Sequence, residues 1–279
     1  MAKGRTSNRK THSVEAVTAG GLTLRLDGSI LTLTAAGTEQ SRLDLDRPDV
    51  LDFEYMQHLD LLLASRHRDA ERLRILHGGA GACALPLCWA QKYPDASQAA
   101  VDTDGEMLGI LKEWAVVPPR TRIKLRIGDV REVLTGSGAT YDVIVRDAFA
   151  GDSTPRSLTT AEWHQLVRSR LRPGGTYLAN VAHGAAPSWT RGQAGAGRSK
   201  SDVAAAFAAF PSLLAIADRK VWRGTRRGNI AVAAWDQGEF DQEWLDQQVR
   251  RLPLPVAIYS RSDIAAWLAG TEPSRDTTG

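Results

Sequence analysis

Cysteine is scarce in this chain. Two of its 279 residues are cysteines, Cys83 and Cys88, which lie five positions apart in a segment whose pattern predicts a helix. On a helix these side chains point to different faces, and the sequence has no other cysteine to pair with them. The sequence therefore excludes a disulfide framework and a zinc site built from thiolates. We expect a cytoplasmic protein.

Long apolar runs and a strong charge excess are also lacking. No run approaches the ~20 apolar residues that a membrane span needs, and no signal-peptide core follows the start, so we expect no membrane partner. Lys and Arg number 35 against 32 Asp and Glu, which gives a net charge of +3. The basic segment 1–12, predicted to be a disordered tail, carries that excess. The charge balance therefore does not indicate a nucleic-acid partner.

The first pattern that the sequence does contain is that of a small β module. Apolar and polar residues alternate, as in half-buried strands, at Val14–Thr18, Leu22–Leu26 and Ile30–Thr34, and Ser41–Leu45 is a candidate fourth strand. Asp27 and Gly28 form a tight hairpin turn. We expect an antiparallel module over 13–48, a main domain over 49–270 and a disordered tail over 271–279.

The main domain begins with a helix from Asp52 to Arg68 and then alternates between strands and helices. The expected strands are Leu73–Leu76, Gln98–Val101, Ile123–Ile127, Tyr141–Val145 and Thr176–Val181. The helices between them are Ala82–Tyr93, Gly105–Trp114, Val130–Leu134 and Thr160–Leu171. This order predicts right-handed βαβ units and an α/β fold whose mostly parallel sheet is covered on both faces.

The last part of the domain predicts an antiparallel end to the sheet. A loop over Ala185–Ser199 and a helix over Asp202–Phe210 lead to three strand-like segments, Leu213–Ala217, Val221-Trp222 and Asn229–Trp235. Glycines flank the turn between the last two, which indicates a hairpin. A parallel sheet that closes with a hairpin is typical of class I S-adenosylmethionine-dependent enzymes, which have a Rossmann-like fold. Helices near Gln242–Arg251 and Ser262–Leu268 follow.

A glycine cluster follows the first strand of the main domain. Gly78, Gly79 and Gly81 separate that strand from the next helix. The order strand, glycine turn, helix is how α/β domains place backbone N–H groups beside a bound nucleoside. Because no lysine follows the glycines, a phosphate-gripping P-loop is excluded.

Carboxylates follow the next three strands. Asp102 lies about twenty residues beyond the glycines, the separation at which an acid reaches ribose hydroxyls. Asp129 and Asp147 follow the third and fourth strands. The alternative for Asp129, and for Asp104, is a helix cap, since each precedes a helix. A nicotinamide enzyme is disfavoured because Ala84 stands at the third fingerprint position and the sheet ends differently.

Five motifs carry a resemblance to a known family. They are Leu73–Ala82, Asp102-Thr103-Asp104, Ile127-Gly128-Asp129, Tyr141–Asp147 and Leu171–Gly175. Together they resemble the spermidine synthase family of polyamine aminopropyltransferases, in particular its actinobacterial spermidine-synthase-like branch, over roughly Val14 to Trp235. The resemblance implies a decarboxylated S-adenosylmethionine donor, no metal, an amine acceptor such as putrescine, and a homodimer.

The resemblance also assigns roles to single residues. Gly79 and Gly81 would line the methionine-derived part of the donor, Asp102 stands where the family has its ribose-binding Glu, and Asp129 would reach the adenine. Asp147 matches the first of the family's two acids after the fourth strand and is a candidate catalytic base. The helix from Asp52 matches the family's tyrosine-bearing helix, which makes Tyr55 a candidate for substrate binding. The alternative for Tyr55 is packing at the edge of the core. His58, on the same helix, is expected on the surface.

The chain departs from the family at three positions. Ala80 replaces the acid that holds the donor's amino group, Ala150 replaces the second acid after the fourth strand, and Met56 follows Tyr55 where the family has His. A cationic amine needs carboxylates for binding and a base for its proton, so these changes weaken that chemistry. Asp152 could restore a base, its alternative being an exposed turn. His77 could exchange a proton at the mouth of the site or be structural.

Three hypotheses stay open. The first is an aminopropyltransferase. The second is an S-adenosylmethionine-dependent methyltransferase, for which Ala80 is easier to accept because an acid there would repel the carboxylate of the intact donor. The third is a non-catalytic binding protein on the same fold, since fold does not decide function.

Overall fold

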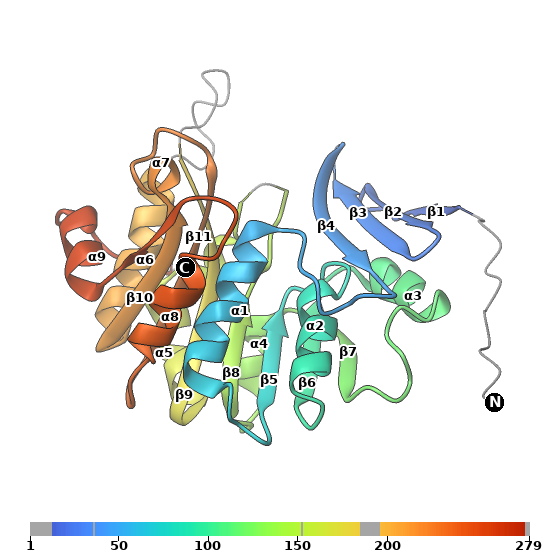
Figure 1. Cartoon of the computed structure of the whole chain (residues 1–279), viewed down its shortest axis with the longest axis horizontal. Helices are drawn as coiled ribbons and strands as arrows, with labels where there is room; N and C mark the ends of the chain where they lie inside the picture. The colour runs from blue at the N-terminus through green and yellow to red at the C-terminus, as the bar shows by residue number, and fades with distance from the viewer. Residues whose placement is uncertain (1–12, 36, 152, 185–195, 277–279) are drawn as a thin grey trace.

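Two β-sheets of different character organise the chain (Figure 1). The computed structural model describes residues 13–35, 37–151, 153–184 and 196–276. The smaller sheet is antiparallel and contains, in spatial order, β1 (Val14–Val17), β2 (Leu22–Asp27), β3 (Ile30–Ala35) and β4 (Thr38–Asp44). Asp27 pairs with Ile30 across a turn in which Gly28 has a φ of +62°. The predicted β module is confirmed, and its fourth strand is longer than expected.

The larger sheet has eight strands among the described residues, in the spatial order β12-β10-β11-β9-β8-β5-β6-β7. Their bounds are β5 (Arg74–Gly78), β6 (Ser97–Asp102), β7 (Ile123–Ile127), β8 (Tyr141–Arg146), β9 (Leu171–His183), β10 (Ser212–Asp218), β11 (Gly228–Trp235) and β12 (Val256–Tyr259). Strands β5 to β9 pair in parallel, whereas β9–β11, β11–β10 and β10–β12 pair antiparallel. The predicted parallel sheet with an antiparallel end is confirmed.

Helices cover both faces of this sheet. Their bounds are α1 (Glu54–His67), α2 (Ala84–Lys92), α3 (Gly105–Glu113), α4 (Val130–Gly136), α5 (Ala161–Arg170), α6 (Ala196–Ala209), α7 (Arg219–Trp222), α8 (Gln242–Val249) and α9 (Arg261–Leu268), with a 3₁₀ turn, η1, at Arg156–Leu158. One apolar core joins α1, α2, α3 and α8 to one face and to the small sheet. The other joins α4, α5, α6 and α9 to the opposite face. Neighbouring strand residues divide between the two cores because side chains alternate along a strand.

The main differences from the prediction lie in the second half of the chain. Val221 and Trp222 belong to helix α7, so a helical turn joins the antiparallel strands β10 and β11. Helix α5 ends at Arg170, and the Pro-Gly run that follows it lies inside β9. Of the predicted loop 185–199, residues 196–199 begin α6 and the rest lies outside the described residues. Strand β12, four residues long and preceded by prolines, was missed.

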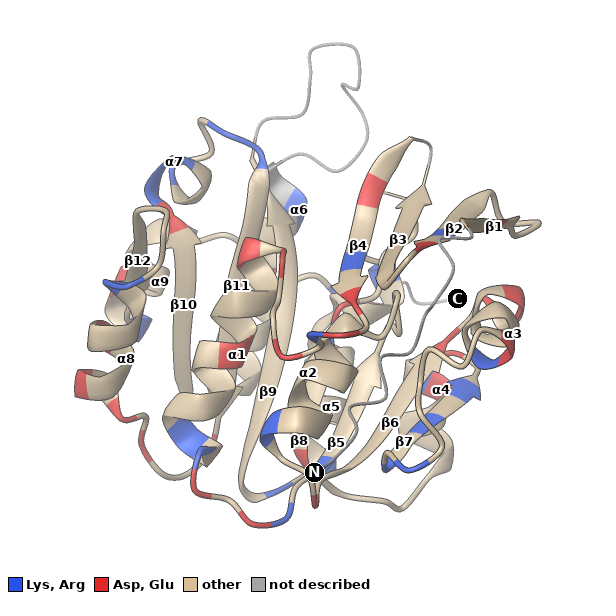
Figure 2. Cartoon of the chain, turned by 45° about the vertical axis from the view of Figure 1, so that its right-hand side comes forward, with Lys and Arg blue, Asp and Glu red and all other residues tan. Residues whose placement is uncertain are grey.

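Charged residues of both signs are spread over the molecule (Figure 2). Blue residues on α7 and on the segment leading to β11 form the densest basic stretch, with five Lys or Arg among residues 219–227. No described helix is long and apolar enough to cross a membrane. Residues 271–276, predicted to be part of a polar tail, lie at the start of α5, where the Ala161 N–H donates to the Ser274 carbonyl at 2.8 Å.

Candidate functional site

The carboxyl ends of the parallel strands are tied to one another by backbone hydrogen bonds. These run from Asp147 N to Gly78 O (2.8 Å), from Gly79 N to Val101 O (2.9 Å) and from Gly128 N to Asp102 O (2.9 Å). They bring the predicted glycines and the three predicted carboxylates to one edge of the sheet, where α/β proteins bind ligands.

The glycine loop is shaped by close approaches that a side chain would block. Gly79 has a φ of +98°, and a Cβ on it would lie 2.3 Å from the carbonyl oxygen of Asp147. A Cβ on Gly78 would meet a methyl group of Val130 at 3.0 Å. Gly81 has a φ of +49° and faces Ser41 of strand β4. At position 79 both the backbone conformation and the contact therefore require glycine.

Helix α2, which follows the loop, has no side-chain cap from any described residue. Its N-cap residue is Cys83, in the left-handed conformation with a φ of +61°, and α2 begins at Ala84, two residues later than expected. By contrast, Asp104 and Asp129 cap α3 and α4. The uncapped first turn of α2 leaves backbone N–H groups beside the glycine loop, an arrangement suited to polar or anionic ligand atoms.

Asp102 braces the glycine loop. One of its carboxylate oxygens accepts a hydrogen bond from the Ala80 N–H at 2.9 Å, and the other accepts one from the Asp104 N–H at 3.0 Å. A carboxylate has about four acceptor positions, so each oxygen can take a further donor such as a hydroxyl. Ala80 itself is buried.

Asp129 and Asp104 act as helix caps. Asp129 accepts hydrogen bonds from the Arg131 N–H at 2.6 Å and the Glu132 N–H at 3.4 Å, and Asp104 accepts one from the Met107 N–H at 2.8 Å. Capping, which the sequence left as an alternative for both, is therefore present in the structure. A contact between Asp129 and adenine stays a prediction.

Asp147 lies at the end of β8 between two side-chain donors. The Tyr55 hydroxyl donates to one carboxylate oxygen at 3.1 Å, and the Asn180 amide donates to the other at 2.8 Å. Burial raises the pKa of Asp147 from 3.8 to about 6, although both hydrogen bonds and the Arg146 charge lower it. A carboxyl with a pKa near 6 exchanges a proton close to neutral pH, as a general base must.

Tyr55 is buried on α1, and its hydroxyl is hydrogen bonded to Asp147. Burial, and then the Asp147 charge, raise the pKa of its phenol well above the usual value, so it stays protonated and donates. The sequence found this residue through its place on the helix. It missed Asn180, because nothing in the sequence relates a single asparagine inside β9 to an acid on β8.

Behind Asp147, on the opposite face of the sheet, Arg146 forms a buried ion pair. Its guanidinium contacts both carboxylate oxygens of Asp202 at 2.8 Å, and Nε2 of His164 lies 3.0 Å from one of them. Burial raises the pKa of Asp202, but the Arg146 charge and the hydrogen bonds outweigh it and hold this pKa below its usual value. Arg146 also donates to the Leu158 carbonyl at 2.8 Å. An arginine at the end of an otherwise apolar strand segment was the available signal for this cluster.

The structure decides between the alternatives for His77 and corrects the expectation for His58. His77 is only 2% exposed and does not lie at the mouth of the site. Its Nε2 lies 2.8 Å from the side-chain oxygen of Gln98, and its ring packs 5.3 Å from Trp89. Burial lowers its pKa to about 4, so the structural alternative holds. His58 is buried rather than on the surface, because α1 is enclosed between the sheet and α8.

The remaining predicted positions are not brought into the cluster. Met56 packs in the core, and Ala150 is exposed, with its N–H donating to the Ser153 carbonyl at 2.8 Å. Asp152 lies outside the described residues. No three His, Cys, Asp or Glu side chains that could hold a metal ion lie together in the described part of the chain.

The small sheet lies next to α2 and α3 (Figure 1). Between β1 and β2, the Thr18 hydroxyl donates to Asp104 at 3.2 Å and the Ala19 N–H donates to Glu106 at 2.5 Å. Both acceptors belong to the start of α3, just beyond Asp102. The β module therefore packs against the corner at which the sequence predicts the ribose.

Comparisons with known proteins place this geometry in context. No protein-family model matches the chain. It is 27% identical over 130 residues to a polyamine aminopropyltransferase of Vibrio vulnificus, a match that covers 46% of this chain and 44% of that protein. The chain thus spans less than half the length of this curated relative.

Two solved structures resemble the chain over most of its length. A probable spermidine synthase from Corynebacterium glutamicum has a TM-score of 0.81 and 28% identity, and the match covers 92% of this chain and 94% of that one. Human methyltransferase-like protein 13, in complex with SAH, has a TM-score of 0.56 and 21% identity, with 81% and 96% covered. The second likeness shows the fold alone. The predicted class I methyltransferase-like fold is confirmed.

Proposed function

From the premise that this chain is a spermidine-synthase-like protein with the class I methyltransferase fold, we propose that it binds an S-adenosylmethionine-type nucleoside at its strand ends. The proposed reaction transfers the donor's aminopropyl group to a small amine such as putrescine. Support comes from the names of the similar proteins and from the chemistry of the Asp147 cluster.

The residues at the strand ends fit such a nucleoside. The positive φ angles of Gly79 and Gly81 set the path of the loop beside the strand ends, and Asp102 retains acceptor positions for ribose hydroxyls. Asp129 would face the adenine. When bound, the decarboxylated donor supplies an aminopropyl group on a sulfonium, and the intact donor supplies a methyl group.

The proposal depends above all on the surroundings of Asp147, whose carboxylate has two side-chain donors and a raised pKa. Its pKa of about 6 lies close enough to neutrality for it to accept the proton that an ammonium must lose before its nitrogen can attack. Tyr55 and Asn180 hold the two oxygens and fix the direction in which the carboxylate points. Asp152 remains proposed as a second base.

Ala80 favours a second candidate, an S-adenosylmethionine-dependent methyltransferase. This residue is buried beside the glycine loop and offers no carboxylate to hold a donor amino group. A site without that acid also lacks the repulsion that would exclude the carboxylate of the intact donor. The two candidates therefore share a fold and a base and differ in the donor.

A transfer assay separates the candidates. Purified protein is incubated with putrescine and either the decarboxylated or the intact donor, and the products are identified by mass spectrometry. Spermidine with 5′-methylthioadenosine supports the first candidate, and a methylated amine with S-adenosylhomocysteine supports the second. If neither product forms although both donors bind, the chain is a non-catalytic binding protein.

A homodimer in the cytoplasm is part of the proposal. It rests on the family resemblance and on the scarcity of cysteine, and both described cysteines are free and buried. Light scattering after size-exclusion chromatography measures the dimer directly. A mass of one chain at micromolar concentration would contradict it.

A further inference from the structure

Residues 271–276, here called the C-terminal strap, turn back after α9 and lie between the starts of α5 and α6. The Thr271 N–H donates to the Leu268 carbonyl at 3.0 Å as the helix ends. Ser274 then makes two backbone hydrogen bonds, accepting from the Ala161 N–H at 2.8 Å and donating to the Ser201 carbonyl at 3.1 Å. The strap is therefore hydrogen bonded to two helices that are far from it in the sequence.

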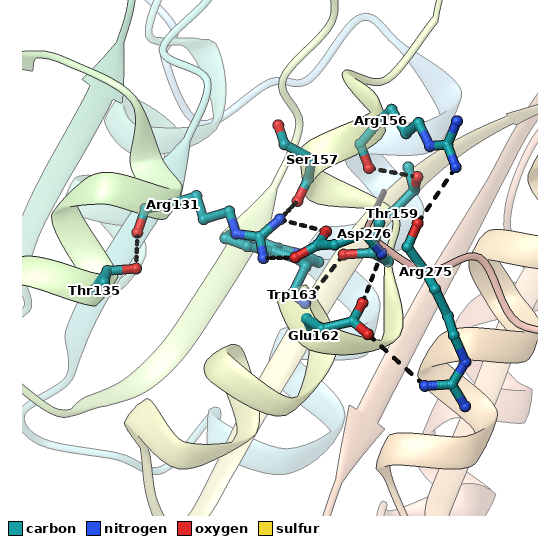
Figure 3. Close-up of polar contacts among 10 residues, drawn as sticks. Arg131, Thr135, Arg156, Ser157, Thr159, Glu162, Trp163, Arg275 and Asp276 are labelled. Atoms are coloured by element: carbon teal, nitrogen blue, oxygen red, sulfur yellow. Dashed lines mark hydrogen bonds and ion pairs between the residues drawn. The ribbon is translucent and has the colours of Figure 1, made fainter. Parts of the chain in front are cut away.

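Asp276, at the end of the strap, holds Arg131 of helix α4 (Figure 3). Both carboxylate oxygens contact the guanidinium, one of them at 2.9 Å from Nη1, in a two-pronged ion pair. The same Nη1 donates to the Ser157 carbonyl at 2.8 Å. The backbone N–H of Asp276 donates to Glu162 at 2.9 Å. One arginine thus links the strap, α4 and the connection after β8.

A second set of contacts fixes the neighbouring residues. Arg156 donates to the Arg275 carbonyl at 3.4 Å, and the guanidinium of Arg275 lies 3.7 Å from the Glu162 carboxylate (Figure 3). These polar contacts lie at the surface, and the Arg131 and Asp276 side chains are 24% and 39% exposed. Because surface ion pairs add little to the free energy of unfolding, global stability does not explain why so many polar contacts converge here.

Both segments that the strap holds lead directly into the candidate site. Arg131 follows Asp129, the predicted adenine contact, and Val130, whose methyl group packs against Gly78. Ser157 belongs to the connection that begins at Asp147 and returns to α5. A shift of the first turn of α4, or of this connection, would therefore move residues on two sides of the nucleoside site.

We propose that the strap positions these two segments for nucleoside binding, with Arg131 and Asp276 as the positioning pair. This inference rests on the proposed nucleoside site. The pair acts at a distance from the ligand by holding the start of α4 against the connection after β8. Because the pair is partly exposed, its effect falls as salt rises.

The test compares Asp276→Asn and Arg131→Met with the unaltered full-length chain. Affinity for 5′-methylthioadenosine and for S-adenosylhomocysteine is measured by calorimetry, and hydrogen exchange is followed in 128–133 and 147–160. Each variant is expected to bind roughly fivefold more weakly, which corresponds to the free energy of one exposed ion pair. Each is also expected to exchange its amide hydrogens faster in both segments. The thermal midpoint of the free protein should stay within the range of the control.

The matched control is Asp236→Asn, which removes a similar surface ion pair with Arg168 (2.8 Å) away from the strap. The exchanged pair, Arg131→Asp with Asp276→Arg, should recover at most part of the affinity, because an aspartate at position 131 cannot donate to the Ser157 carbonyl. Unchanged affinity and exchange in both single variants, or equal losses in the control, would overturn the proposal. If the unaltered chain binds neither nucleoside, the proposed function fails, and the exchange rates alone decide whether the strap orders the two segments.

Discussion

The two corners of the candidate site hold their carboxylates in different ways. At the β5–β6 corner, backbone N–H groups donate to both oxygens of Asp102. At the β8–β9 corner, the side chains of Tyr55 and Asn180 donate to both oxygens of Asp147, whose pKa burial raises to about 6. Backbone donors belong to the fold itself, so Asp102 braces the loop without a second side chain. Side-chain donors adjust the pKa of Asp147, the proposed base.

The corners differ also in the elements that build them. The β5–β6 corner is made by residues close in the sequence, and its shape depends on glycine backbone conformations. The β8–β9 corner combines α1, β8 and β9, with Arg146 and Asp202 buried behind it. We therefore expect changes in the first corner to remove binding and changes in the second to remove turnover.

The largest effect is expected from Gly79→Ala. Its Cβ would lie 2.3 Å from the Asp147 carbonyl oxygen at a φ of +98°, so the loop must move away from β8. Nucleoside affinity should fall at least ~100-fold, and unfolding should become easier by roughly 3 kcal/mol. Calorimetry and thermal unfolding measure the two.

Gly109→Ala is the matched control for this change. A Cβ at this position of α3 meets no atom within 4 Å. The control should bind normally and gain up to ~1 kcal/mol of stability, as Ala does over Gly in a helix. Normal nucleoside binding by Gly79→Ala would show that the glycine loop is not part of the nucleoside site.

Asp147→Asn comes next. Loss of the base should slow transfer roughly 100-fold or more, while nucleoside affinity stays within about twofold. Single-turnover rates and calorimetry on the same preparation separate the two quantities. Asp95→Asn, which changes an exposed acid paired loosely with Arg122 at 3.7 Å, is the control. If Asp152→Asn slows transfer and Asp147→Asn does not, the base assignment is wrong.

The raised pKa of Asp147 also predicts a pH dependence of stability. Between pH ~4 and ~6 the folded state holds a proton that the unfolded state has released, so this group lowers the free energy of unfolding as pH rises through that window. Relative to the unaltered chain, Asp147→Asn should therefore gain roughly 2 kcal/mol of stability from pH 4 to pH 7. Urea unfolding at each pH gives the difference. A difference that does not change with pH would contradict the raised pKa.

Tyr55→Phe should have the smallest effect. It removes a hydrogen bond that lowers the pKa of Asp147, so that pKa should rise and the acid limb of the rate profile should move to higher pH. At pH 6 transfer should slow roughly fivefold, and the difference should shrink as pH rises. Tyr93→Phe is the control, a buried tyrosine at the end of α2. An equal loss at every pH would indicate that Tyr55 contacts the substrate instead.

The β5–β6 corner was largely predictable from the sequence, because its signals are local. Strands buried on both faces leave apolar runs, and the glycines and acids that end them stand at fixed places in those runs. Gly79 and Asp102 were found in this way, although the bracing of Ala80 by Asp102 was not.

The β8–β9 corner was predictable only in part, because its partners are far apart in the sequence. Asn180 lies 33 residues from Asp147, and His164 and Asp202 meet Arg146 only in the folded chain. The C-terminal strap was missed for the same reason, since its polar residues resemble a tail until their partners are known.

Calorimetric titration of the unaltered chain with decarboxylated and intact S-adenosylmethionine tests the central claim most directly. The proposed function predicts saturable binding of at least one donor at one site per chain, lost in Gly79→Ala and retained in Asp147→Asn. Preference for the decarboxylated donor indicates aminopropyl transfer, and preference for the intact donor indicates methyl transfer. Failure of both donors to bind at millimolar concentration would contradict a nucleoside site at these strand ends.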